Sequence, residues 1–268
     1  MNINDKNIVN GDEPVILVER KNKIEIITLN RPKAGNSIDG ELAQALNNAL
    51  NQAEKDPEVY AVILTGAGSK VFCAGADVKY MAKYGAEGTK IQGHGFGGLT
   101  ERFFAKPLIC AVNGAAMGGG LELALACDII IAAEHAKFGF PEVKLGIIAA
   151  GGGPIRIMRS VSRAIALELL FTGDGISAQR ALEIGLINRV AASENLLDQT
   201  LELVERIANN APIAVRGTKE LACKSIDLDL EDAFKLSNSI RDRVRESEDS
   251  KEGSLAFREK RTPVWKNR

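Results

Sequence analysis

The sequence contains few of the residues that hold metal ions. Its two histidines, His94 and His135, stand apart from any spacing typical of metal ligands, and its four cysteines form no CxxC pair. Cys110 and Cys127 lie in apolar runs, where a cysteine most simply packs as a small apolar side chain. We therefore assign no residue to a metal site.

A charge excess and long apolar runs are also missing. The 268 residues carry a net charge of -1 and give an isoelectric point of about 6.2. This net charge does not attract the molecule as a whole to nucleic acid or to an anionic membrane. No apolar run approaches the roughly 20 residues of a membrane span. Residues 1–13 are polar and lack both the apolar core of a signal peptide and an Arg-rich transit pattern. We expect them to form a loose tail on a cytoplasmic protein with no nucleic-acid or membrane partner.

The sequence also lacks a phosphate-binding loop of the GK[ST] type. Gly93, Gly95 and Gly98 match the spacing GxGxxG, but no strand precedes them and no acid follows at the distance that a dinucleotide fingerprint requires. We interpret residues 84–100 as a mobile glycine-rich loop.

The most informative stretch covers residues 107–142. The apolar run Leu108 to Val112 predicts a buried strand, and the glycines Gly118 to Gly120 lead into a helix-like segment whose apolar face carries one acid, Glu122. The stretch closes on a second isolated acid, Glu142, directly after a proline. Glycines let a ligand approach the backbone, and the first amides of a helix point outward with the positive end of its dipole. Since Glu122 lies one turn after the middle glycine, a backbone donor and a carboxylate would face one space. The alternative is a glycine-rich turn followed by a solvated Glu.

A second segment bares backbone amides in the same way. Val71 to Met81 reads VFCAGADVKYM, in which Asp77 is a suitable N-cap for a helix that begins at Val78. The small residues before this cap would again leave the backbone accessible before a helix.

Several motifs, in the right order, resemble the crotonase family of enoyl-CoA hydratases and isomerases. The resemblance rests on LNRPKAGNSID, FCAGADVKYM, NGAAMGGGLELALACD, FGFPEVKLGI, TGDGISAQRALEIGLINRV and LAFREKR. It covers nearly the whole chain after Val15.

The residues and the resemblance agree on an α/β fold. Val15 to Glu19 and Ile24 to Leu29 predict a hairpin, and Asp39 is a plausible N-cap for the helix that follows. Strand and helix patterns then alternate as far as Ala133, which predicts parallel strands with crossover connections. The family implies a more particular shape, a crotonase-like spiral of strand-strand-helix repeats with a C-terminal helical region. We expect the α/β core with the acyl-CoA site over residues 14–200 and a helical trimerisation region over residues 201–268, in a homotrimer or a hexamer made as a dimer of trimers. Within that region, the pattern of residues 230–244 predicts an amphipathic helix with Phe234 inside.

The resemblance implies an enoyl-CoA hydratase, a lyase that adds water reversibly to a 2-enoyl-CoA thioester. It implies Glu122 and Glu142 as the catalytic residues, and the amides of Ala76 and Gly119 as an oxyanion hole. Coenzyme A is part of the substrate, so no separate cofactor is implied. The residues that match the family's coenzyme A contacts are Lys33, Ala34, Ala74, Asp77, Val78, Phe257 and Lys260.

Local arguments assign different roles to the two carboxylates. Glu122 lies in the first turn of a helix, where the dipole favours the ionised form, whereas the apolar segment around Glu142 favours the protonated form. We therefore expect the two pKa values to be pushed apart, with Glu122 as the base that activates water and Glu142 as the acid.

Alternatives remain open at this level. One glutamate would suffice for an enoyl-CoA isomerase, and residues 95–104 and 247–268 are similar to the carnitinyl-CoA dehydratase branch of the family. The resemblance also implies that residues 84–100 form a rim or lid of the acyl pocket. A protein of the same fold that only binds a CoA thioester or RNA is the non-enzymatic alternative. Ala149-Ala150 and Gly153 to Arg156 depart from the common hydratase pattern, which leaves the shape of the substrate pocket open.

Overall fold

The computed structural model describes residues 13–268, so most of the expected N-terminal tail lies outside the described residues. The strands are β1 (Ile16–Lys21), β2 (Ile24–Leu29), β3 (Ala61–Gly66), β4 (Val71–Cys73), β5 (Lys90–Ile91), β6 (Gly95–Phe96), β7 (Leu108–Val112), β8 (Ala115–Met117), β9 (Ile129–Ala133), β10 (Lys137–Gly139), β11 (Ile176–Ser177) and β12 (Arg189–Ala191). The α-helices are α1 (Gly40–Lys55), α2 (Val78–Tyr84), α3 (Gly119–Leu125), α4 (Gly153–Ser160), α5 (Arg163–Thr172), α6 (Ala178–Glu183), α7 (Leu196–Ala208), α8 (Pro212–Ser225), α9 (Leu230–Glu246) and α10 (Glu248–Glu259). Short 3₁₀ helices are η1 (Pro32–Ala34), η2 (Ala86–Thr89), η3 (Pro141–Leu145) and η4 (Ser193–Asn195).

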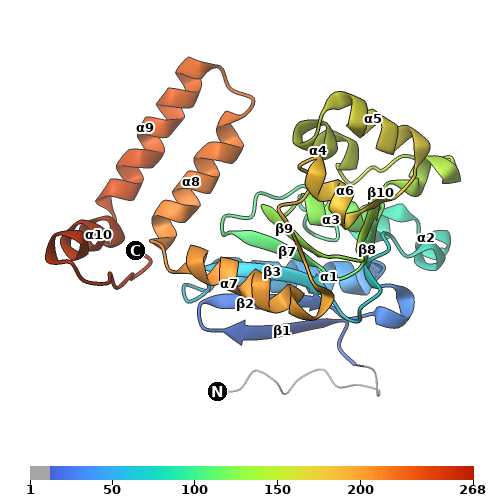
Figure 1. The fold of residues 1–268 in the computed structure, drawn as a ribbon, viewed down its shortest axis with the longest axis horizontal. Helices are drawn as coiled ribbons and strands as arrows, with labels where there is room; N and C mark the ends of the chain where they lie inside the picture. The colour runs from blue at the N-terminus through green and yellow to red at the C-terminus, as the bar shows by residue number, and fades with distance from the viewer. Residues whose placement is uncertain (1–12) are drawn as a thin grey trace.

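Two sheets carry the fold (Figure 1). The larger has the strand order β1-β2-β3-β7-β9-β12, in which β1 and β2 form the expected antiparallel hairpin and the later neighbours pair in parallel. The smaller has the order β11-β10-β8-β4. Along the chain, each turn places one strand in the large sheet, the next in the small sheet, and then a helix: β3-β4-α2, β7-β8-α3 and β9-β10-η3. This is the expected strand-strand-helix repeat. Each parallel pair is joined by a crossover connection, although the sequence itself contains no visible repeat.

The large sheet is buried on both faces from β2 to β9, whereas its edge strand β1 is mostly exposed. Alternate residues of its strands divide between two clusters: Val62 and Leu64 of β3 belong to one, and Ile63 to the other. Helix α1 packs on the first face, and α7 covers the second with Val204 and neighbouring residues. Parallel strands covered on both sides read as continuous apolar runs, which is why residues such as Leu108 to Val112 predict strands well.

The helices begin where the sequence predicts. Asp39 is the N-cap of α1 and accepts a hydrogen bond from the Leu42 amide at 2.9 Å. Asp77 caps α2 by accepting from the amides of Lys79 and Tyr80, both at 3.1 Å. These local hydrogen bonds satisfy amides that a helix leaves without internal partners.

Two expectations about packing are wrong. Residues 84–100 do not form a loose loop but a folded segment, in which η2 and the β5-β6 hairpin bury Phe96 and Leu99. Phe234 is not inside: its side chain is 62% exposed, because the hairpin of α8 and α9 projects away from the sheets (Figure 1).

The expected boundary at residue 201 falls within α7, the helix that packs on the large sheet. Among residues 13–268 no helix is both long and apolar enough to cross a membrane.

A buried lysine closes the C-terminal end of α1. Lys106 is 3% exposed, and its Nζ donates to the carbonyl oxygens of Ala53 and Asp56, both at 2.6 Å. Burial, together with the positive charge of Arg216, lowers the pKa of Lys106 to about 8.

This lysine predicts a pH dependence of stability. Between pH 8 and the usual lysine range, the unfolded chain holds a proton that the folded chain has lost, so raising the pH favours the folded state. Relative to Lys106→Met, the wild-type free energy of unfolding should rise by up to about 1.4 kcal/mol per pH unit in this window. Urea unfolding of both proteins at several values of pH measures the difference. A difference that stays flat or falls with pH contradicts the prediction.

Candidate active site

Three segments of the site meet because three parallel strands end at the same edge of the small sheet. β8 pairs in parallel with β4 on one side and with β10 on the other. The residues that follow them are 74–77, 118–122 and 140–142. The Gly118 amide donates to the Gly139 carbonyl at 2.9 Å and so joins two of the segments.

The first segment leaves one amide facing the site. Residues Gly75 and Asp77 exchange backbone hydrogen bonds with Ile38, both at 2.8 Å, in an isolated parallel bridge to Ala76. Because neighbouring peptide groups point to opposite sides of an extended chain, the N–H of Ala76 faces away from Ile38. No hydrogen bond among residues 13–268 uses this amide.

The second segment comes within backbone contact of the first. A Cβ on Gly120 would clash with the Cys73 carbonyl, and one on Gly75 would lie 3.1 Å from the Gly119 nitrogen. Gly118 adopts φ 55° and ψ −123°, a conformation that favours glycine. The Gly119 amide, at the start of α3, also has no hydrogen-bond acceptor among residues 13–268. The glycines therefore serve close approach, as the sequence predicts.

Glu122 is buried, not solvated. It is 3% exposed, and its Oε1 accepts a hydrogen bond from the Gly153 amide at 2.8 Å. Burial raises the pKa of Glu122, against the opposing effects of the amides of Gly153 and Gly151 and the charge of Arg156. The helix dipole was expected to favour the ionised form; in the structure the pKa of Glu122 is instead raised, because the side chain is buried.

Glu142 shares the cavity with Glu122 and has fewer partners. Its carboxylate lies against Gly118, where an added Cβ would meet Oε1 at 2.7 Å, and its Oε2 is buried without a hydrogen-bond partner. Burial, and then the negative charge of Glu122, raise the pKa of Glu142 above the usual value, in the expected direction.

The segments enclose a cavity of about 210 Å³. It contains Glu122, Glu142, Ala76 and Gly119 in its wall, and the rest of its surface is mainly apolar. The other lining residues are Ala74, Gly75, Val78, Met81, Ala86, Thr89, Lys90, Phe96, Gly118, Pro141, Leu145, Ile147, Ile148, Ala150 and Gly151.

The expected coenzyme A contacts divide into three groups. Ala74 and Val78 line the cavity. The helix η1, which contains Lys33 and Ala34, lies beside it, because the Ala74 amide donates a hydrogen bond to the Gly35 carbonyl at 2.9 Å. Asp77 caps α2 and pairs with Arg31 instead of lining the cavity. Phe257 and Lys260 lie at the end of α10, far from α2 and α3 of the same chain (Figure 1), and Phe257 is 88% exposed.

Sequence reasoning did not identify two contacts within the site. Phe96, in a segment interpreted as a loose loop, packs its ring on Gly119, where an added Cβ would lie 2.6 Å from the ring. The other contact is made by the turn of Gly151 to Gly153, whose amides hold Glu122. The run of three glycines was the one sequence feature that could have indicated this contact, but Glu122 lies 31 residues away from Gly153 in sequence.

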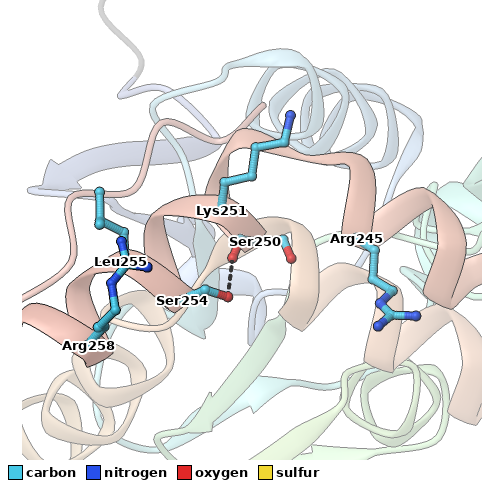
Figure 2. A pocket seen from close by; sticks show the side chains of 6 residues that line it. All are labelled: Arg245, Ser250, Lys251, Ser254, Leu255 and Arg258. Carbon is cyan, nitrogen blue, oxygen red and sulfur yellow. Dashed lines mark hydrogen bonds between the residues drawn. The ribbon is translucent and has the colours of Figure 1, made fainter.

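A second cavity, of about 410 Å³, lies on the outer side of α9 and α10 (Figure 2). Its basic side chains, Arg245, Lys251 and Arg258, do not converge in this view. It contains none of the expected catalytic residues.

Comparisons with known proteins fit this fold and site. The family model described as enoyl-CoA hydratase/isomerase matches residues 19–268. The carnitinyl-CoA dehydratase of Proteus mirabilis is 44% identical over 257 residues, which cover 94% of this chain and 98% of that protein. The enoyl-CoA hydratase structure from Mycobacterium tuberculosis is 43% identical with a TM-score of 0.92, covering 96% of this chain and all of that one. The carnitinyl-CoA hydratase structure from Mycobacterium avium is 44% identical with a TM-score of 0.76, with the same coverage.

The fold is therefore the crotonase fold, and the protein is an enzyme of the lyase and hydratase type. The chain belongs to the enoyl-CoA hydratase/isomerase family.

The contact of Gly151 with Glu122 gives a test of this geometry. In Gly151→Ala the new Cβ would clash with Oε2 of Glu122 and displace the carboxylate from the Gly153 amide. Loss of a buried charged hydrogen bond should destabilise the protein by about 1–3 kcal/mol. The matched control is Gly253→Ala in α10, where the added Cβ would make an ordinary contact with Trp265 at 3.4 Å and should stabilise the helix by about 0.5–1 kcal/mol. Urea unfolding should give changes of opposite sign, and an unchanged or more stable Gly151→Ala protein contradicts the geometry.

Proposed function

We propose that this enzyme adds water reversibly to a 2-enoyl-CoA thioester. The observation that carries the proposal is the arrangement of Glu122, Glu142 and the amides of Ala76 and Gly119 around one cavity. Coenzyme A is part of this substrate, and the proposed reaction requires no further cofactor.

The two amides would bind the thioester oxygen. During hydration the carbonyl becomes enolate-like, and donors already fixed by the fold stabilise the negative charge without reorganising. Ala76 and Gly119 suit this role because the hydrogen bonds among residues 13–268 leave both N–H groups free.

The two carboxylates would move the protons. Glu122 takes a proton from water as the water oxygen bonds to the β-carbon, and Glu142 gives a proton to the α-carbon as the enolate returns to the carbonyl. In dehydration the two exchange tasks. Burial raises both pKa values. The amides of Gly151 and Gly153 and the charge of Arg156 favour the ionised form of Glu122, whereas Glu142 has only its own amide to do so and the charge of Glu122 opposes it. That asymmetry supports Glu122 as the base and Glu142 as the acid.

The cavity wall supports an apolar acyl group. Val78, Met81 and Leu145 contribute to it, and its one positively charged side chain, Lys90, pairs with Glu87 at 2.7 Å. The second candidate is nevertheless a carnitinyl-CoA dehydratase, because relatives at 42% and 44% identity carry that name. An isomerase remains a third possibility, which the retained pair of buried carboxylates disfavours, and the balanced net charge disfavours an RNA-binding role.

We also propose that a homotrimer, or a dimer of trimers, completes the coenzyme A site. Phe257 and Lys260 match coenzyme A contacts of the family but lie far from the cavity of their own chain (Figure 1). The exposed ring of Phe257 supports a role at a neighbouring subunit, where it would stack on adenine while Lys260 pairs with phosphate. Lys33 would contribute from η1.

An activity panel tests the reaction. Crotonyl-CoA, longer 2-enoyl-CoAs, crotonobetainyl-CoA and a 3-enoyl-CoA are each followed by absorbance of the conjugated double bond. We expect the highest kcat/KM for an uncharged 2-enoyl-CoA. Preference for crotonobetainyl-CoA would favour the second candidate, and turnover of the 3-enoyl-CoA alone would favour an isomerase.

Glu122→Gln and Glu142→Gln should each lower hydration by at least about 10²-fold while keeping the fold. The double variant should be little worse than either single one, because groups that act as a unit are not additive. Near wild-type hydration by Glu142→Gln would disprove the two-carboxylate mechanism.

The assembly proposal has its own test in α10. Lys260→Glu should raise KM for CoA thioesters by about tenfold or more, because it replaces an attraction to phosphate with a repulsion. The control Lys251→Glu makes the same charge change on the same helix, where Lys251 is exposed, and should keep the wild-type KM. Sedimentation should give a trimer or hexamer for all three proteins, and a monomer that binds CoA thioesters normally would refute the proposal.

A further inference from the structure

One half-buried guanidinium connects two walls of the cavity. Arg156, on α4, donates from Nη2 to the Thr100 carbonyl at 2.5 Å. Its Nη1 lies against the turn at Gly152, where an added Cβ would clash with it. The side chain thus bridges the start of α4 and the segment that follows β6.

Each end of this bridge leads to a residue of the site. On one side, the turn beside Arg156 supplies the Gly153 amide that holds Glu122 at 2.8 Å. On the other, Oγ1 of Thr100 accepts from the Phe96 amide at 3.0 Å, and the Phe96 ring packs on Gly119.

The charge of Arg156 has no paired carboxylate. Among residues 13–268 no acidic side chain lies within ion-pair distance of it. The ionisable groups whose fields reach it are Glu122, Cys127, Arg159 and Glu101, with Glu122 first in effect. Around Glu122 the charged neighbours are Arg156, which favours the carboxylate, and Glu142, which shares the cavity. Although burial lowers its pKa, a guanidinium remains charged in proteins, so Arg156 keeps its positive charge.

We infer that Arg156 is a positioning residue, which fixes the turn that holds Glu122 through its hydrogen bond to Thr100 and whose charge favours the carboxylate form of Glu122. The inference rests on the proposed role of Glu122 as the base. The contacts of Arg156 are with the two walls, and the inferred role requires no contact between Arg156 and the substrate.

The test compares Arg156→Met with Arg156→Lys and a matched control, Arg159→Met. Arg159 lies on the same helix, is exposed, and pairs with Asp227 at 3.3 Å. The first readout is the pH profile of kcat/KM with the best substrate of the panel, because its acidic limb reports the base of the free enzyme. We expect Arg156→Met to lower kcat about 10- to 100-fold and to move the acidic limb to higher pH. Arg156→Lys, which keeps the charge, should leave the acidic limb near that of the wild type, and Arg159→Met should match the wild type throughout.

A second readout needs no turnover. In protein labelled with ¹³C at glutamate carboxyls, the Glu122 signal is identified by its loss in Glu122→Gln and is followed through a pH titration. It should titrate at higher pH in Arg156→Met than in the wild type, and should the methionine variant not fold, Arg156→Gln serves the same comparison. An acidic limb and a Glu122 titration that both match the wild type would overturn the inference. Inactivity of the wild type on every thioester would instead remove the proposed function, and the titration would still decide the effect of Arg156 on Glu122.

Discussion

Close approach of two backbones is the constraint on which the site depends. The start of α3 lies against the end of β4 so closely that a methyl group on Gly120 would clash with the Cys73 carbonyl. This contact brings the Ala76 and Gly119 amides to one cavity, and the parallel pairing of β4, β8 and β10 holds the ends of those strands at one edge. Glu122 and Glu142 follow from the same geometry, because each comes within a few residues of one of these strand ends. The chemistry is therefore fixed by strand register more than by side-chain packing.

Local signals in the sequence predicted much of this arrangement. The apolar runs of parallel strands, the N-caps Asp39 and Asp77, and the glycines before Glu122 each have a physical cause within a few residues. The strand-strand-helix spiral came from the family resemblance, because the two sheets alternate along the chain without a repeated sequence.

The parts that could not be predicted depend on residues distant in sequence. The pKa of Glu122 is raised because the chain buries it, a property that a seven-residue helix does not reveal by itself. The glycine turn at 151–153 and the ring of Phe96 reach the site only through tertiary packing. Phe234 has the spacing of a core residue in α9, yet the projecting hairpin leaves it on the surface, because periodicity identifies an apolar face but not what covers it.

In the cavity wall, main-chain groups and side chains make different kinds of contact, and this difference affects how the substrate range of such an enzyme can change. Its polar contacts come largely from main-chain N–H groups, which every residue except proline carries, whereas its apolar surface comes from side chains on separate segments, among them Val78, Leu145 and Ile148. Replacing one of those side chains reshapes the space for the acyl group without removing a donor or a carboxylate. Under the proposed mechanism, substrate range can therefore change by single substitutions while the two carboxylates and the two amides stay in place, and added bulk at the glycines is the change that this arrangement does not accommodate.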